Sequence, residues 1–599
     1  MIFLLDAVYK LGKLNIQKEN LDQIDVLLDN KKIGAVILIE FIENSDGNLA
    51  YDKVFQENYD SRNKIKYLYK RGSSRGTDIT PSCLITDLDK TFNNKFLKWF
   101  DKNKNSNEFF GRLNDIISVN EDIIFEDISN LLKIIDIKDA NILLSLVISN
   151  NGNIKYLNDF KEFKDILLQN SLEKFYKSGS KKIKGKSTCC LCDEEKEVYG
   201  LVSNAIGFAF STPEKVGNVP GNNIENQWKL LPICSDCALY LNAGKNYVEK
   251  YLDFSEFGLR YYVIPNFLLE SSKTFDSLDK TLKLFNQENS DSSDLVMIEN
   301  RLAKLVKRLN DVIEFKFLFY QSSNNAFDIL AYVESIIPSW LTELYETQEK
   351  ISSYDFFHED NLKLVFGDKH SGDFIGLINK NEKHYLCSYD NWYKRFLRDF
   401  INNFSRKMYI DTVVDIISNK KIDYNFLLSR MMNKIRFNWR NEENYAMKVS
   451  ILKSLMLLIL LNDLNLIKGG KLMSLNNDEF SIDLMLDSPS KKATFLLGVL
   501  TKKLMNIQYK EIGSTPFYNK LWGLSLDEKK IHKLYPMVLD KLYQYNANYY
   551  SKLEEEISEN LTKSNGNWKL NRDETSYFFV LGFTLPNYDK NEKGDDLNE

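Results

Sequence analysis

Four of the seven cysteines in this sequence stand in two CxxC pairs, Cys189/Cys192 and Cys234/Cys237. Thiolates bind soft metal ions, and a CxxC turn places two sulfurs on one tight knuckle. Two such knuckles supply the four ligands of tetrahedral Zn²⁺. Because four thiolates leave no open position for water, we expect this zinc to be structural rather than hydrolytic.

Two alternatives to this zinc site stay open. The cysteines can instead form two unrelated pairs of buried thiols. Cys190 can also replace Cys189 in the first pair, although the resulting CxC spacing is cramped. The knuckles are farther apart than in a compact zinc ribbon, so the loop between them must fold back to bring them together.

A basic, glycine-containing segment is the first candidate for contact with a nucleic-acid backbone. It has the sequence YLYKRGSSRG and begins at Tyr67. Lys70, Arg71 and Arg75 can grip phosphate while the glycines let backbone amides approach it. Tyr67 and Tyr69 can stack on bases or pack as strand residues. A purely structural loop is an equally good interpretation of this segment.

A second basic segment directly precedes the first CxxC pair and contains Lys181, Lys182, Lys184 and Lys186. Its GKS sequence resembles the end of a phosphate-binding P-loop. However, Gly179 and Gly185 are one residue too far apart, and no apolar strand precedes them. We therefore reject nucleotide binding here. The lysines either meet a phosphate backbone or form a solvated loop.

A third basic segment, rich in aromatic residues, contains Arg430, Lys434 and Arg436. On a helix, Arg430 and Lys434 share one face. These residues are the remaining nucleic-acid candidates, although a solvated helix face is the commoner explanation of such a pattern.

Little else in the sequence suggests catalysis. The four histidines form neither an HExxH motif nor an adjacent His-Asp pair, and there is no GxSxG elbow. Cys83 and Cys387 lack a nucleophile signature and are expected to be buried thiols. We therefore expect that the protein is not an enzyme.

The charge balance limits how nucleic acid can be bound. Seventy-nine Lys and Arg against 84 Asp and Glu give a net charge of −5, which excludes a uniformly basic coat. The N-terminus lacks the features of a signal peptide. The apolar run Leu455–Leu461 is far shorter than the roughly 20 residues of a membrane span. We expect a cytoplasmic protein, where reducing conditions favour metal binding over disulfides.

The elements that must position these residues are partly predictable in the first half. Residues 35–41 are typical of a buried strand and residues 64–70 of a basic, aromatic strand, while the spacing in residues 94–176 is mostly helical. Further strands are predicted at 259–264, stopped by Pro265, at 314–320 and at 327–333. A helix is expected to open at Pro338.

The second half is predicted to be helical from about residue 390. Ser488 and Pro489 are typical of a helix cap and first turn. A second helix is expected to begin near Asp527, and a third to run through residues 577–581.

The predicted fold class is α+β and predominantly helical. It has a mixed α/β N-terminal part, an inserted four-cysteine zinc module and a C-terminal helical bundle. The expected segments are an N-terminal domain, the zinc insert, a continuation of the N-terminal domain, a helical connecting region and the bundle. They cover residues 1–180, 181–250, 251–350, 351–484 and 485–599, in that order.

Four landmarks, taken in order, resemble a known family. They are KYLYKRGSSRG from Lys66 with the following Thr80-Pro81; the two CxxC pairs, the second within LPICSDCALYLNAG from Leu231; IPSW from Ile337; and FLLGVL from Phe495 with LMNIQ from Leu504. In these features the chain is similar to the large subunit (Cas-eight, b type) of the subtype I-B CRISPR effector complex Cascade. Only the CxxC pairs are specific individually, and the order and spacing carry the resemblance.

The resemblance implies a non-catalytic subunit in antiviral defence. Such a subunit would bind the 5′ region of the guide RNA and the target double-stranded DNA, recognise the PAM and license recruitment of a helicase-nuclease. Its partners would be the Cascade backbone subunits and the helicase-nuclease. A C-terminal small subunit can also be made separately in this family, and Met473 and Met485 are candidate internal starts here.

Two other classes of protein compete with this interpretation. A zinc-dependent nuclease or other metal hydrolase predicts an additional His/Asp/Glu cluster, which the sequence does not display. A zinc-stabilised scaffold with only protein partners fits the small net charge but leaves the basic loop around Arg71 unexplained.

Overall fold

The computed structural model describes residues 2–585 except 30, 45–47, 73–75, 136–139, 151, 208–216, 218, 269–271, 289–312, 324–325, 358, 367–391 and 470–481. The chain divides into two compact units, which are described separately here. Unit 1 comprises residues 1–253, 264–277 and 322–327, and unit 2 comprises residues 254–263, 278–321 and 328–599.

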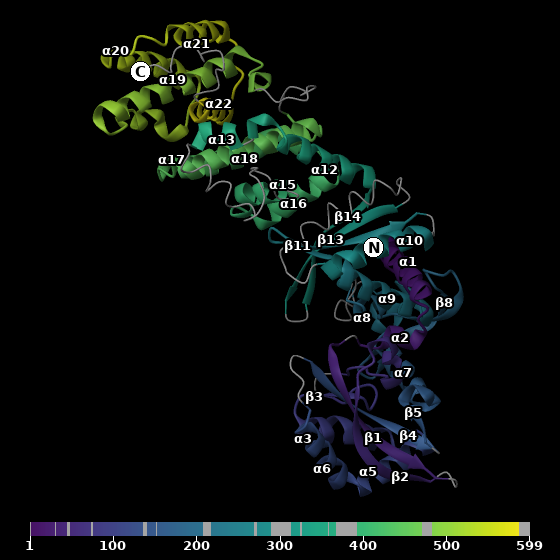
Figure 1. The fold of residues 1–599 in the computed structure, drawn as a ribbon. Helices are drawn as coiled ribbons and strands as arrows, with labels where there is room; N and C mark the ends of the chain where they lie inside the picture. The colour runs from purple at the N-terminus through teal and green to yellow at the C-terminus, as the bar shows by residue number, and fades with distance from the viewer. Residues whose placement is uncertain are drawn as a thin grey trace. The chain divides into compact units, whose positions relative to one another are not determined.

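A five-stranded sheet organises one part of unit 1 (Figure 1). Its strands follow the order β2-β1-β4-β3, with β5 paired to β4, and β1 and β4 are parallel while the other pairs are antiparallel. The strands are β1 (Ile33–Glu43), β2 (Leu49–Asn58), β3 (Cys83–Ile85), β4 (Asn141–Asn150) and β5 (Asn153–Tyr156).

Both faces of strand β1 are covered, which explains its continuous apolar sequence. Ile37 and Ile39 belong to a core shared with the helices that connect β3 to β4. Val36 and Leu38 point to the other face and pack in a second core with Tyr67. The helical elements around this sheet are η1 (Ser61–Tyr67), α3 (Leu88–Thr91), η2 (Phe92–Leu97), α4 (Lys98–Asn103), α5 (Glu108–Val119), α6 (Glu121–Leu132), η3 (Leu157–Asp159) and α7 (Lys161–Glu173).

The other part of unit 1 combines the N-terminal helices with the region of the CxxC pairs. Helix α1 packs along α9, and α2 contacts both α7 and α9. The elements are α1 (Ile2–Glu19), α2 (Gln23–Leu27), β6 (Lys177–Ser178), β7 (Lys181–Lys182), β8 (Lys184–Thr188), β9 (Glu195–Tyr199), α8 (Val202–Ala205), η5 (Pro220–Asn222), η6 (Ile224–Lys229), β10 (Ile233–Cys234) and α9 (Ser235–Tyr251).

A four-stranded sheet with the order β11-β12-β13-β14 lies mostly in unit 2. Its strands are β11 (Asp253–Glu256), β12 (Leu259–Phe267), β13 (Ile313–Ser323) and β14 (Ala326–Ile336). Helix α10 (Ser272–Glu288) follows β12. Helix α12 (Pro338–Ser352) then begins with Pro338 in its first turn, where the missing amide hydrogen costs nothing.

The rest of unit 2 is almost entirely helical (Figure 1). Its elements are η7 (Asp355–Phe357), α13 (Glu359–Phe366), α15 (Trp392–Leu397), η8 (Arg398–Asn402), α16 (Arg406–Ile417), β15 (Ile422–Asp423), α17 (Tyr424–Arg440), α18 (Asn444–Asp463), β16 (Ile467–Lys468), η9 (Ile482–Met485), α19 (Pro489–Ile512), η10 (Pro516–Leu524), α20 (Glu528–Gln544), α21 (Ser551–Ser564) and α22 (Arg572–Thr584).

Helix α18 is, by length and composition, apolar enough to cross a membrane. However, 72% of its apolar window is buried inside the protein. It contacts α12, α13, α15, α17 and α22, which surround it with other apolar surfaces. A helix that is apolar on all sides is typical of a protein core, and this is the environment in which α18 lies.

The structure confirms the α+β, predominantly helical class and several local predictions. The strand at 35–41, the hairpin of β13 and β14 and the helices capped by Ser488 and Asp527 are all present. The finer division into five segments stays a prediction.

Two local predictions are wrong, and one is incomplete. Residues 64–70 do not form a strand, because η1 continues to Tyr67 and Leu68 then takes a left-handed conformation. Residues 94–176 are mostly helical, as predicted, but they also contain β4, a buried central strand. Strand β12 continues through Pro265 to Phe267 rather than stopping before the proline.

Candidate metal centre and basic surfaces

Three short strands bring the two CxxC pairs together. Strands β8 and β9 form an antiparallel hairpin, and the first CxxC pair lies in the turn between them. Strand β10 pairs with β9, placing Cys234 opposite Val198. Helix α9 begins directly after Cys234 and carries Cys237 in its first turn. The loop between the pairs therefore does fold back, as the long sequence separation requires.

The sulfur atoms of Cys189, Cys192, Cys234 and Cys237 all lie within 4.8 Å of one another. The Cys192 and Cys234 sulfurs are 3.9 Å apart. Zinc–sulfur bonds of ~2.3 Å in a tetrahedron separate the sulfurs by about 3.8 Å, so the cluster fits a tetrahedral ion. These four residues can hold a metal ion, and zinc is the ion that such a donor set favours.

The surroundings of the cluster favour negative charge on one sulfur. Hydrogen bonds from the Cys234 and Cys237 thiols lower the pKa of the Cys189 thiol. The Cys234 amide also donates to the Cys189 sulfur over 3.4 Å. A thiolate is the form of cysteine that binds metal, so this arrangement is suited to a cation.

Polar contacts join the two knuckles outside the cluster. Lys196 forms ion pairs with Glu194 beside the first knuckle, at 2.6 Å, and with Asp236 in the second, at 3.1 Å. On the other side, burial and the nearby Cys237 and Cys192 thiols raise the pKa of the Tyr9 hydroxyl, which belongs to helix α1. The cluster therefore lies between the β8–β9 hairpin and the α1–α9 pair.

The remaining cysteines fit secondary roles. Cys190 is half-buried beside the cluster, and its amide donates to the Pro232 carbonyl over 2.8 Å. It is not one of the four clustered residues, so the register that uses Cys190 is not the one that the structure adopts. Cys83 is buried, as expected, and Cys387 lies outside the described residues. Within the described part of the chain, the four cysteines are the only metal-binding group found.

The rejection of a P-loop at Gly185 agrees with the structure. Gly185 lies inside strand β8, and a Cβ atom there would come 2.4 Å from the Trp228 ring. The glycine is therefore needed so that the tryptophan can lie against the strand. Of the four lysines nearby, Lys184 pairs with Glu197 at 2.8 Å and Lys186 with Glu195 at 3.8 Å, while Lys181 and Lys182 are exposed.

The first basic segment begins with residues that are packed or hydrogen-bonded within unit 1. Both Tyr67 and Tyr69 are buried, so in this structure they are packing residues rather than free stacking platforms. Asp29 accepts hydrogen bonds from the Lys70 ammonium and, over 3.1 Å, from the Arg71 amide. Arg71 itself is exposed. Arg75 lies outside the described residues.

Several lysines that the sequence gave no reason to select lie around Asp29. Lys64 is on η1, Lys174 follows α7, and Lys245 and Lys250 are on α9. Partial burial of its ammonium group and repulsion from Lys70 and Lys245 lower the pKa of Lys174 to about 8. Burial and repulsion from Lys250 and Lys70 likewise lower the pKa of Lys64. These residues are far apart in sequence, so no local motif could have identified them.

The third basic segment lies on α17, where two of its residues contact aromatic rings. The Arg430 guanidinium is 4.0 Å from the centre of the Phe404 ring, and the Lys434 ammonium is 5.3 Å from that of Phe437. Phe404 and Phe437 are themselves exposed. This face combines cations with exposed aromatic rings, the combination used to bind single-stranded nucleic acid.

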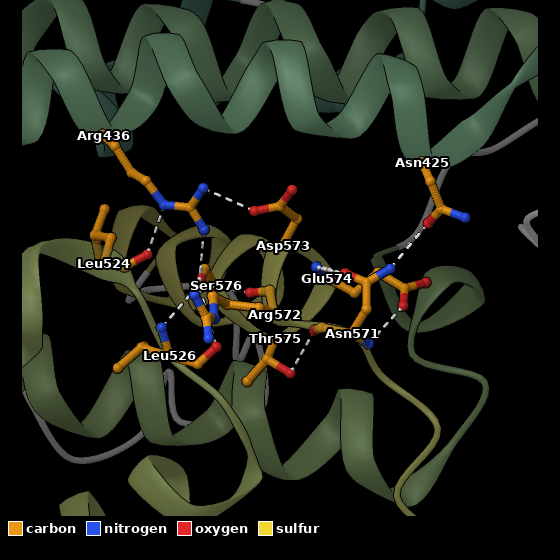
Figure 2. A network of polar contacts seen from close by, with 10 residues as sticks. All are labelled: Asn425, Arg436, Leu524, Leu526, Asn571, Arg572, Asp573, Glu574, Thr575 and Ser576. Atoms are coloured by element: carbon orange, nitrogen blue, oxygen red, sulfur yellow. Dashed lines mark hydrogen bonds and ion pairs between the residues drawn. The ribbon is translucent and has the colours of Figure 1, made fainter.

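Arg436 points in a different direction, into a polar network (Figure 2). Its guanidinium pairs with Asp573 at 2.7 Å and donates to the Leu524 carbonyl over 2.9 Å and to the Ser576 hydroxyl over 3.3 Å. Arg436 thereby joins α17 to α22 and to the end of η10. These partners already engage the guanidinium of Arg436. Its contact with nucleic acid stays a prediction.

Three family models match successive parts of the chain. The N-terminal domain of CRISPR-associated protein TM1802 matches residues 4–169, the central domain residues 186–336 and the C-terminal domain residues 389–596. The four-cysteine cluster lies within the central match. No curated protein matches the chain.

Proposed function

The chain belongs to the CRISPR-associated protein TM1802 family, and from this premise we propose that it is the non-catalytic large subunit of a subtype I-B Cascade complex. Matches to all three domains of one family, in order, are the observation that carries the proposal. Membership gives the protein a role in CRISPR defence. The proposed activities are binding of the guide-RNA 5′ region and target DNA, PAM recognition and licensing of the helicase-nuclease, in the cytoplasm.

The metal centre supports a structural role within this subunit. Four cysteines surround the site and leave no ligand position for an attacking water. In the described residues, no second group of His, Asp or Glu accompanies the cysteines as a hydrolase would require. We therefore propose that Zn²⁺ fixes the β8–β9 hairpin to the start of α9 and takes no part in cleavage.

The basic surfaces support contact with nucleic acid at two places. Around Asp29, unit 1 gathers lysines from several elements beside the exposed Arg71. In unit 2, the α17 face presents Arg430 and Lys434 together with Phe404 and Phe437. A net charge of −5 leaves the rest of the chain without a general attraction for nucleic acid, so binding depends on such patches.

The test compares duplexes that differ only in the PAM. The chain is purified with the guide-RNA backbone subunits, and binding to PAM-bearing and PAM-mutated duplex is measured. Tighter binding to the PAM-bearing duplex is expected, and equal binding to both would overturn PAM recognition. Chelator-sensitive cleavage by the isolated chain would favour the nuclease, and failure to bind RNA or DNA in any form would favour the scaffold.

A matched pair of variants locates the contact within unit 1. Arg71→Ala should weaken target binding, because the exposed guanidinium lies beside the lysines around Asp29. Lys161→Ala is the control, since Lys161 is exposed at the far end of α7. Equal binding by both variants would refute the assignment of Arg71.

The separately made small subunit also remains part of the proposal. Met485 is the last residue of η9, shortly before α19, and Met473 lies outside the described residues. Expression of the intact gene followed by mass spectrometry should show a short C-terminal product starting at one of them. Its absence would count against an internal start.

A further inference from the structure

The lysines around Asp29 form a cluster that combines four elements of unit 1. Lys64 comes from η1, Lys70 from the loop after it, Lys174 from the end of α7, and Lys245 and Lys250 from α9. Asp25 and Asp29 are the carboxylates that favour the charged form of Lys64, and Glu249 pairs with Lys245 at 2.9 Å. Among these named residues, together with Arg71, positive groups outnumber negative ones.

The cluster is accessible to a ligand. Arg71, Lys174 and Lys250 are exposed, and Lys64, Lys70 and Lys245 are half-buried. Within the described residues, the Lys174 ammonium donates one long hydrogen bond, 3.4 Å, to the Asn242 side chain and none to a carboxylate. Like charges gathered without enough counter-charge cost free energy, and an anion that enters the cluster relieves that cost.

Asp29 balances part of this charge, and Glu249 balances another part through its ion pair with Lys245. Asp29 accepts from the Lys70 ammonium and from the Arg71 amide, and it lies close enough to favour the charged forms of Lys64 and Lys174. A backbone amide and an ammonium group that donate to one oxyanion, with further ammonium groups nearby, are also the usual partners of a bound phosphate. The carboxylate therefore competes for the same donors that a phosphate would use.

We propose that this cluster is a phosphate subsite for a nucleic-acid backbone, with Lys64, Lys174 and Lys245 as its ligands, and that Asp29 competes with the phosphate for Lys70. The inference rests on the proposed function, because it assumes that the protein binds nucleic acid. It adds residues outside the basic loop and an internal carboxylate that weakens binding. The subsite reads backbone charge and not base sequence.

Helix α9 connects this subsite to the metal centre. Its first turn carries Cys237, while Asn242, Lys245 and Lys250 follow along the same helix. The Asn242 side chain also donates to the Val26 carbonyl over 3.3 Å, which holds α9 against the segment that leads to Asp29. A metal ion bound by the cysteines would thus help to position two residues of the cluster, Lys245 and Lys250.

The experiment measures binding of the full-length chain to a short single-stranded RNA, the same sequence as DNA, and a duplex DNA, each at two salt concentrations. The variants are Lys174→Met, Lys64→Met and Asp29→Asn, with Lys161→Met as the control from the same helix as Lys174. Melting temperatures are recorded for all variants, so that a loss of binding is not confused with a loss of fold.

Each lysine variant should weaken binding about tenfold and reduce the salt dependence by roughly one phosphate contact, whereas Lys161→Met should change neither. Asp29→Asn should tighten binding, because the amide can still accept from Arg71 but no longer competes for charge. The probe for which the lysine variants lose the most binding affinity identifies the kind of nucleic acid that occupies the subsite.

If the wild-type chain binds a probe and the Lys174→Met and Lys161→Met variants bind it with equal affinity, the subsite is overturned while the proposed function stays intact. Weaker binding by a well-folded Asp29→Asn would overturn the competition. If the wild-type chain binds none of the three probes, alone or with the backbone subunits, the proposed function itself fails.

Discussion

Two helix pairs in the molecule cross closely at glycines, and they differ in what else holds them. In unit 1, Gly12 of α1 meets Gly244 of α9, where an added Cβ would lie 1.9 Å or 2.0 Å from a backbone carbonyl oxygen. In unit 2, Gly498 of α19 meets Gly582 of α22 with distances of 2.1 Å and 1.9 Å. Backbone contact at this distance allows only glycine.

The bundle around α19 and α22 combines extensive apolar packing with polar contacts such as the Arg436–Asp573 ion pair. Every residue of α22 from Thr575 to Thr584 is buried, and α19 is covered by α20, α21 and α22. The α1–α9 pair instead ends at the cysteine cluster, beside three strands of two to five residues. From this comparison we predict that a metal ion bound by the cysteines stabilises the small region of short strands, whereas the larger helical bundle is stabilised by its own packing.

Removing two metal ligands should reveal the clearest difference in stability between the cysteine region of unit 1 and the helical bundle of unit 2. Cys234→Ser with Cys237→Ser should abolish binding of an ion that contributes on the order of 10 kcal/mol to small zinc domains. Hydrogen exchange should accelerate in β8–β10 and at the start of α9 and stay unchanged in α19 and α22. Cys190→Ser is the control, and equal acceleration in both regions would contradict the comparison.

Valine at the glycine crossings should give the next largest effect. Gly582→Val should destabilise the bundle by about 3 kcal/mol because the helices must move apart. Gly244→Val should instead loosen α9 and weaken metal retention. Chemical unfolding and metal content distinguish the two, with Asn506→Val on an exposed position of α19 measuring the cost of valine in a helix. A loss of metal in the Gly582→Val variant would contradict the expectation that only the α1–α9 crossing affects the metal centre.

The Arg436 network offers a smaller change within unit 2. Arg436→Met should destabilise the chain by about 2 kcal/mol, since it leaves the partly buried Asp573 without its partner. Lys434 lies on the same helix and forms no ion pair with the residues that the structure describes, so Lys434→Met should have little effect on urea unfolding. If nucleic-acid binding falls more in Lys434→Met than in Arg436→Met, the exposed α17 face is the binding surface.

The smallest expected effect concerns pH and Lys502. Burial and repulsion from Lys448 lower the pKa of Lys502 below its ordinary value of 10.5. The unfolded chain therefore binds this proton more tightly than the folded chain, so stability rises as pH increases between the two pKa values. Lys502→Met should stabilise the protein at neutral pH, and the gain should shrink towards pH 10.5. A gain that does not depend on pH would exclude this cause.

Sequence alone determined those features that depend on neighbouring residues. The Ser488 cap with Pro489, the opening of α12 at Pro338 and the apolar strand β1 follow from local backbone and burial preferences. The two CxxC pairs also predicted the metal cluster, because each pair is local and only their approach is not.

Tertiary structure decided the features that depend on distant contacts. Tyr67 and Tyr69 pack on a sheet face that another segment completes, so their aromatic composition alone misassigned residues 64–70 as a strand. Strand β4 was missed because its parallel partner β1 lies about a hundred residues earlier in the sequence. The lysines around Asp29 come from four separate elements, and only folding brings their charges together. Local pattern specifies each element, whereas charge clusters and pairings arise from the energy of contacts between elements.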